Sequence, residues 1–258
     1  MALHPEIIVI VVIAGLFCGF LNAAASSGSA VSLPILMSVG LHAVAANATN
    51  RVPVLVGALA ATIGLARKGA IPWRRALIIA APLTLGAGIG ALLSERIPSH
   101  DLRIVIVAAV VIALVLILTR LKSLLASASD SDVRLGWKPL CLLFFVGIWT
   151  GFIVLDSGTY MLLVLVLASG LTLVEANAVK NLATLTTTLV AMAIFAAHQS
   201  IDWKIGGVMA LGSVAGGFLG AKLAISDQGR RWIVGLLVVV IVGEVINLAL
   251  RYCTGLLS

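Results

Sequence analysis

The chain has 258 residues, of which 61% are hydrophobic and only 10% charged, and its mean hydropathy is +1.19. A soluble domain carries about 25% charged residues, so this composition excludes a soluble protein and predicts an all-α, polytopic integral membrane protein. The net charge of +7 does not indicate nucleic-acid binding, because the basic residues are scattered through short segments between apolar stretches, where they serve to orient a membrane protein.

Eight apolar segments follow one another along the chain, at 7–39, 43–66, 74–93, 102–120, 138–169, 172–197, 204–225 and 231–250. The first and fifth are longer than one span needs, and small polar residues interrupt them at Asn22–Ser29 and Asp156–Tyr160. A straight helix of about 31 residues would be about 46 Å long, whereas two full spans need about 40 residues. We therefore predict that each is a re-entrant or broken helical hairpin, with an outright span as the alternative.

The two long segments open two copies of one repeat. Motifs recur at an offset of 130 residues: Ser27-Gly28 as Ser157-Gly158, Gly40-Leu41 as Gly170-Leu171, Ala46-Asn47-Ala48 as Ala176-Asn177-Ala178, and Gly86-x3-Gly90 as Gly216-x3-Gly220. Doubled membrane domains with polar breaks at matching positions are typical of secondary transporters. We predict a first membrane repeat at 1–122, a linker at 123–137 and a second repeat at 138–258, each a hairpin plus three transmembrane helices.

The distribution of basic residues favours an inverted relation between the two repeats. If the long segments are re-entrant, four cations fall on one side of the membrane: Arg96, Arg103, Lys204 and Arg251. Eleven fall on the other: Arg67, Lys68, Arg74, Arg75, Arg120, Lys122, Arg134, Lys138, Lys222, Arg230 and Arg231. If they span, the same count is 10 to 5. The positive-inside rule therefore predicts an inner-membrane protein with both termini outside and a cytoplasmic linker.

Glycine pairs in both halves have the spacing of closely packed helices. They are Gly15/Gly19, Gly86/Gly90, Gly147/Gly151 and Gly216/Gly220. Small residues four apart let two helix backbones approach closely. We expect this packing inside the subunit, with a homodimer contact as the alternative.

Each half also carries a polar cluster on one face of the helix that follows its hairpin. The clusters are Asn47, Asn50 and Arg51 in the first half, and Asn177, Lys180 and Asn181 in the second. Residues i, i+3 and i+4 of a helix share one face. Arg51 and Lys180 lie about ten residues into their helices, or roughly 15 Å, which predicts that both cations reach the bilayer midplane and converge there from opposite sides.

A cation at that depth costs at least about 2.5 kcal/mol and needs a partner. Two cations, four amides and hydroxyl-bearing hairpin tips favour a bound anion. We predict a substrate site of Ser27, Gly28, Ser29, Asn47, Asn50, Arg51, Ser157, Gly158, Thr159, Asn177, Lys180 and Asn181. The alternative is that ion pairs, Lys180 with Asp156 or Arg51 with Glu244, only join helices. Asp156 and Glu244 are also candidates for proton coupling, and Glu175 for a favourable first-turn acid.

At these motifs the chain resembles the TauE/SafE sulfite exporter family, also called the TSUP family. The resemblance covers nearly all of both halves and rests on the order and duplication of several motifs: Gly15-x3-Gly19, Leu33-Pro34, Gly40, Ala46-Asn47-Ala48-Thr49-Asn50, Gly69-x-Ile71-x-Trp73 and the Gly86/Gly90 pair. It implies a membrane transporter, often an exporter, of sulfur-containing anions. The family's tips are typically glycine-rich, whereas Ser26–Ser29 and Asp156–Thr159 carry polar side chains, so we expect a sulfonate at least as readily as sulfite.

These inferences predict a secondary transporter that moves a sulfonate or sulfur oxyanion by alternating access, with the anion site at the repeat interface. An anion channel on the same scaffold is the alternative. We predict no enzyme activity, cofactor or metal, because an intramembrane enzyme would need a nucleophile–base pair or a metal cluster and no histidine lies near Asp156 or Glu244 in the sequence. The expected partners are a small anionic substrate and the lipid bilayer, with no nucleic acid and with a homodimer left open.

Overall fold

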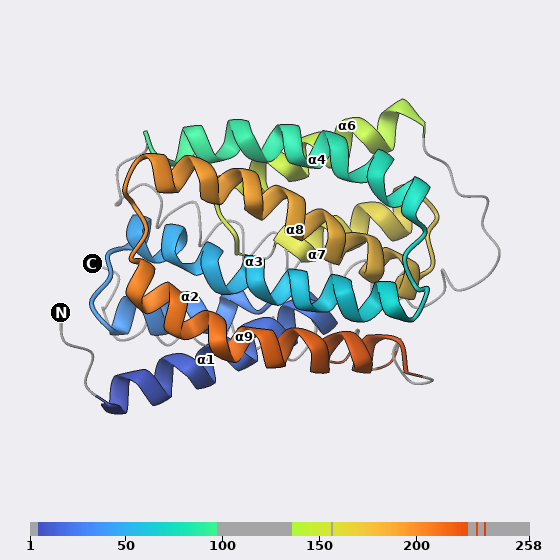
Figure 1. Cartoon of the computed structure of the whole chain (residues 1–258). Helices are drawn as coiled ribbons and strands as arrows, with labels where there is room; N and C mark the ends of the chain where they lie inside the picture. Colours follow the sequence, from blue (N-terminus) through green and yellow to red (C-terminus); the bar gives the residue numbers. More distant parts are fainter. Residues whose placement is uncertain (1–4, 97–135, 156, 227–230, 232–234, 236–258) are drawn as a thin grey trace, which may run out of the picture.

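The computed structural model describes residues 5–96, 136–155, 157–226, 231 and 235, and the elements of this part are all helices (Figure 1). In chain order they are α1 (Pro5–Ala25), α2 (Ser29–Ser38), α3 (Ala43–Arg67), α4 (Trp73–Ser94), α6 (Trp137–Phe152), α7 (Ser157–Leu163), the π-helix η1 (Val164–Ala168), α8 (Leu173–Ala197) and α9 (Trp203–Ala224). The prediction of an all-α protein is confirmed.

Five of the described helices, α1, α3, α4, α8 and α9, are long and apolar enough to cross a membrane. Four of them coincide with predicted spans. The predicted span at 102–120 lies outside the described residues, and so does that at 231–250 apart from residues 231 and 235. Many large apolar side chains on these helices are exposed, among them Phe17 on α1, Leu85 on α4 and Leu211 on α9. Such a surface suits lipid as the solvent, so the polytopic membrane class is confirmed.

Both long segments are broken at the predicted places, but their arms are unequal. The first break follows Ala25, so α1 has 21 residues and α2 only 10. The chain folds back on itself here and brings Gly28 against α1. An ideal Cβ on Gly28 would lie only 2.0 Å from the main-chain oxygen of Cys18. The second break leaves α6 with 16 residues. A break near the centre of each segment would give two short arms of similar length. The first arm of the first segment, α1, is instead long enough to cross the membrane by itself.

The glycine pairs join the two halves to each other. An ideal Cβ on Gly15 would lie 1.8 Å from the main-chain oxygen of Met209, and one on Gly216 would lie 2.0 Å from that of Leu16. α1 therefore packs backbone-to-backbone on α9. The same packing recurs between α6 and α4, where an ideal Cβ on Gly90 would lie 1.9 Å from the main-chain oxygen of Ile148. Packing within the subunit is confirmed for these pairs. The first arm of each hairpin packs against the last described helix of the other half.

Contacts along the helices set their directions. Gly15 and Gly19 of α1 lie against Met209 and Ser213 of α9, so these helices are parallel. α3 also runs parallel to α9, since the approach of Gly206 to Val52 is followed by that of Gly217 to Gly57. These helices lie side by side in Figure 1.

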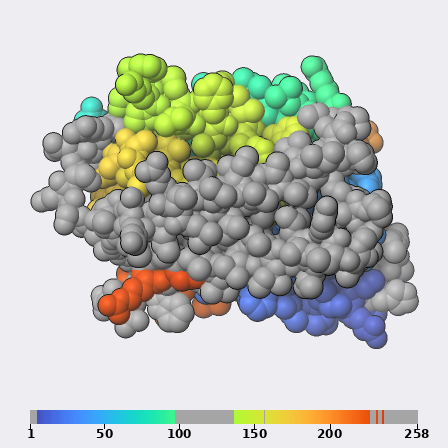
Figure 2. Space-filling view, turned by 180° about the vertical axis from the view of Figure 1, so that it is seen from behind, coloured from blue at the N-terminus to red at the C-terminus, as the bar shows by residue number. Residues whose placement is uncertain are grey.

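The second set of parallel helices is α4, α6 and α8. Gly147 and Gly151 of α6 lie against Leu83 and Ala87 of α4. Thr84 of α4 donates to Thr186 of α8, at 2.8 Å, and further along both helices Gly88 faces Val190. Figures 1 and 2 place α1 at one edge of the molecule, and α4 with α6 at the other.

The two sets run in opposite directions. Arg51, near the start of α3, stacks on Phe195, near the end of α8. By the repeated motifs α1 and α3 correspond to α6 and α8. Corresponding helices of the two halves are therefore antiparallel.

Candidate functional site

Arg51 and Lys180 are the two largest fully buried side chains in the described part of the chain, with exposed fractions of 0% and 1%. Among the described residues neither cation has a carboxylate within 4.0 Å. The predicted ion-pair partners Asp156 and Glu244 lie outside the described residues, so these two pairings stay predictions. Both cations instead contact main-chain oxygens of the broken helices.

Arg51 binds the end of α6. Its two terminal nitrogens donate to the main-chain oxygens of Thr150 and Gly151, each at 2.7 Å. The last carbonyls of a helix have no partner within the helix and carry its negative dipole end, so a planar, forked cation suits two of them at once. The guanidinium carbon lies 5.4 Å from the ring centroid of Phe195, within cation–π range. Its Nε has no hydrogen-bond partner among the described residues.

Lys180 binds the end of α1 in the corresponding way. Its ammonium donates to the main-chain oxygen of Asn22 at 2.5 Å. The amides of Asn177 and Asn181 both donate to the next oxygen, that of Ala23, at 2.9 and 3.1 Å. The polar cluster of the second half therefore completes the broken helix of the first half.

Asn47 and Asn50 hold both hairpins from α3. The amide of Asn47 donates to the oxygen of Phe152 at 3.0 Å, and its own oxygen accepts from the backbone nitrogen of Val154 at 3.3 Å. Asn47 thus bonds on both sides of the point where α6 ends. Asn50 donates to the hydroxyl of Ser29 at 3.1 Å, at the start of α2. All four cluster asparagines have protein partners for their amide nitrogens.

The two hairpin tips touch each other. An ideal Cβ on Gly158 would lie 2.5 Å from the Cβ of Ser26, so only glycine fits at this point of the second tip. Ser26 has a φ of +73°, which L-residues other than asparagine and aspartate rarely adopt. The side-chain oxygens of Ser26 and Thr159 are buried and have no hydrogen-bond partner among the described residues.

The remaining tip residues stabilise the turns themselves. The backbone nitrogen of Gly28 donates to the side-chain oxygen of Asn22 at 2.9 Å. The hydroxyls of Ser27 and Ser157 donate to nearby main-chain oxygens, those of Ala25 at 3.4 Å and Val154 at 3.1 Å. These hydroxyls satisfy local backbone acceptors.

The expectation that the two cations converge at one depth stays a prediction. Phe195, which stacks on Arg51, lies fifteen residues beyond Lys180 on α8. Each cation lies at the end of the broken helix that it binds, Arg51 at that of α6 and Lys180 at that of α1.

All twelve residues of the predicted substrate site are buried. The structure brings them together as a network around two touching tips, in which the cations bind helix ends. Sequence reasoning missed the acceptors, the main-chain oxygens of Asn22, Ala23, Thr150, Gly151 and Phe152, because every residue has such an oxygen. It also missed Phe195, a single aromatic residue in an apolar helix.

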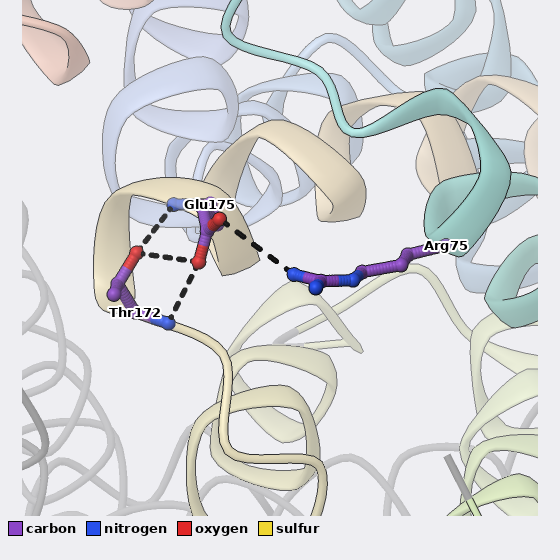
Figure 3. A network of polar contacts seen from close by, with 3 residues as sticks. All are labelled: Arg75, Thr172 and Glu175. Atoms are coloured by element: carbon purple, nitrogen blue, oxygen red, sulfur yellow. Dashed lines mark hydrogen bonds and ion pairs between the residues drawn. The ribbon is translucent and has the colours of Figure 1, made fainter. Parts of the chain in front are cut away.

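Glu175 has the predicted role at the start of α8 and lies apart from this network. Thr172 and Glu175 form a reciprocal capping box, in which the Thr172 hydroxyl accepts from the Glu175 nitrogen at 3.3 Å (Figure 3). Arg75 from α4 approaches the same carboxylate at 4.0 Å, and both side chains are more than one-third exposed. The box fixes where α8 begins, and thereby the depth of Asn177 and Lys180.

Comparisons with known proteins agree on one family. The family model described as "Sulfite exporter TauE/SafE" matches residues 11–245. A "Probable membrane transporter protein" of Haemophilus influenzae is 30% identical over 223 residues, 86% of each chain. The "Probable membrane transporter protein YfcA" of Escherichia coli K12 is 26% identical over 238 residues, 92% of this chain and 87% of that protein. No solved structure matches the chain.

Proposed function

The chain belongs to the sulfite exporter TauE/SafE family of membrane transporters, and from this premise we propose that it carries a sulfonate or a related sulfur oxyanion. Transport proceeds outward across the inner membrane by alternating access. The observation that supports an anionic substrate is the burial of Arg51 and Lys180, neither with a carboxylate within 4.0 Å among the described residues.

Main-chain oxygens orient these cations but cannot cancel their charge, because a carbonyl is a dipole and not an anion. Two uncompensated positive charges in an apolar interior are unfavourable. A bound oxyanion would remove this penalty. The unbonded Nε of Arg51 is one donor left for it, and the Lys180 ammonium, which has three N–H groups, makes one bond, to Asn22, among the described residues. The four asparagines hold the tips in place around it.

The cross-connections between the halves support alternating access. Arg51 belongs to the first half and holds α6, whereas Lys180 belongs to the second half and holds α1. An anion that draws either cation away from its helix end would loosen a hairpin of the opposite half. Binding on one side of the membrane would thus be transmitted to the other half.

We further propose that the two halves are inverted repeats, which the antiparallel directions of their corresponding helices support. Among the cations in or next to the described helices α1–α9, six lie at one end of the bundle: Arg67, Lys68, Arg74, Arg75, Lys138 and Lys222. Arg96 and Lys204 lie at the other end. The positive-inside rule assigns the end with six cations to the cytoplasm.

The test is a thermal-shift and flux assay with sulfite, thiosulfate, taurine, isethionate and chloride as probes. We expect at least one sulfur oxyanion, and not chloride, to raise the melting temperature of the purified protein and to be transported in liposomes with saturable, counter-flow-stimulated kinetics. Arg51→Ala and Lys180→Ala should each abolish the shift. No response to any sulfur anion would contradict the substrate class, and unsaturable flux without counter-flow would indicate a channel.

A further inference from the structure

We propose that the hydroxyls of Ser26 and Thr159 bind the oxygens of the transported anion at the contact between the two hairpin tips, and so determine its specificity for oxyanions. This inference rests on the proposed function and adds the residues that recognise the substrate. It starts from two hydroxyl groups, one in each half, that have no hydrogen-bond partner among the residues that the structure describes.

Ser26 and Thr159 are 5% and 1% exposed, and their side-chain oxygens make no hydrogen bond to any described residue. A buried hydroxyl without a partner costs about 1–3 kcal/mol. The neighbouring Ser27, Ser29, Ser32 and Ser157 are equally buried, yet each is hydrogen-bonded. Lack of a partner is therefore particular to Ser26 and Thr159 within the described tips.

The two hydroxyls come from opposite hairpins that meet at one point. Gly158 contacts Ser26 so closely that an ideal Cβ would lie 3.0 Å from the Ser26 oxygen, and Thr159 is the next residue along the chain. The absence of a side chain at Gly158 thus lets the second tip come close to the Ser26 hydroxyl. An anion with several oxygens can accept from a hydroxyl of each half at once.

The backbone at Ser26 gives a second reason to assign it a role. Its φ of +73° is a conformation for which glycine is the favourable residue. A serine there carries conformational strain that a glycine would not. A side chain kept at such a position, buried and without a partner, is explained by a ligand that uses its hydroxyl.

The experiment compares Ser26→Gly and Thr159→Val with two matched controls. Thr187→Val removes a hydroxyl that is also fully buried but is bonded to Ala183 and Thr184 of its own helix. Ser38→Ala removes an exposed hydroxyl bonded to Ile35. The probes are isethionate and sulfite, titrated against the purified full-length protein and measured as flux in liposomes.

We expect Ser26→Gly and Thr159→Val each to weaken anion affinity about tenfold, the value of a hydrogen bond to a charged group. Thr159→Ser, which keeps the hydroxyl, should restore affinity, and both controls should bind as the wild type does. Ser26→Gly should also melt at a higher temperature without anion, because it relieves the strained φ. This combination of a more stable protein with weaker binding is not expected of a purely structural serine.

The results separate the two proposals. If the wild type binds neither probe nor any other sulfur oxyanion, the proposed function fails. If the wild type binds a probe and Arg51→Ala abolishes binding, while Ser26→Gly and Thr159→Val bind it as tightly as the wild type, the proposed function stands and the hydroxyl assignment is overturned. Unchanged binding in Thr159→Val alone would restrict the site to Ser26 and overturn the paired assignment.

Discussion

The ammonium nitrogen of Lys180 lies 2.5 Å from the main-chain oxygen of Asn22, a residue 158 positions earlier in the chain. This bond joins α8 of the second half to the end of α1 in the first. Arg51 makes the reciprocal connection to α6. The same two side chains therefore carry the positive charge of the interior and hold the two hairpins in position.

Replacing Lys180 by methionine keeps most of its length but removes the donor to Asn22. We expect loss of the anion-dependent shift in melting temperature, because both the positive charge and its N–H donors are removed. Lys68→Met, at an exposed position after α3, is the control and should keep the shift. A Lys180→Met protein with the anion response of the wild type would contradict the role assigned here.

The close approach of α1 and α9 predicts opposite effects for two glycines of one helix. In Gly216→Ala the new methyl group would meet the oxygen of Leu16, whereas an ideal Cβ on Gly207 has no atom within 4 Å. Gly216→Ala should therefore destabilise the protein by about 1–3 kcal/mol through overpacking. Gly207→Ala should stabilise it by roughly 0.5–1 kcal/mol, since alanine is the better helix former. Thermal unfolding in detergent measures both, and equal effects would refute the packing.

The start of α8 predicts a contrast between a helix cap and a surface ion pair. Thr172→Ala removes the capping hydroxyl and should lower the free energy of unfolding by about 1 kcal/mol. Arg75→Ala removes only a largely exposed partner of Glu175 at 4.0 Å, and such pairs contribute about 0–1 kcal/mol. Because the cap also sets the depth of Lys180, we expect Thr172→Ala alone to weaken anion binding. A larger effect from Arg75→Ala would contradict this assignment.

The inverted arrangement predicts which helix ends share one side of the membrane. In a background with Cys18, Cys141 and Cys253 changed to serine, single cysteines at Arg67 and Lys138 should react with an impermeant maleimide only from the cytoplasmic face. A cysteine at Lys204 should react only from the other face. Labelling of Arg67→Cys and Lys138→Cys from opposite faces would exclude the proposed orientation.

Much of this fold could be predicted because its signals are local. The polar breaks in two overlong segments, the glycine spacing and the acid at Glu175 each reflect the chemistry of a few neighbouring residues. The connections between the halves could not be predicted from the sequence, because Arg51 and Lys180 bind main-chain oxygens, which every residue carries. The register of α3 against α8 also depends on contacts such as that of Arg51 with Phe195, which join residues far apart in the sequence and emerge only from the tertiary structure.

The first helix of each half packs against a helix of the other half, and this has a consequence for how such a protein could have arisen. In α1 and α6 the glycines face a helix encoded by the other half. A polypeptide with only one half would expose this glycine-lined face of its first helix. It would bury that face only by pairing with a second copy in a domain-swapped dimer. Duplication and fusion of such a gene would make the exchange intramolecular, and would free each copy to diverge, one keeping an arginine and the other a lysine.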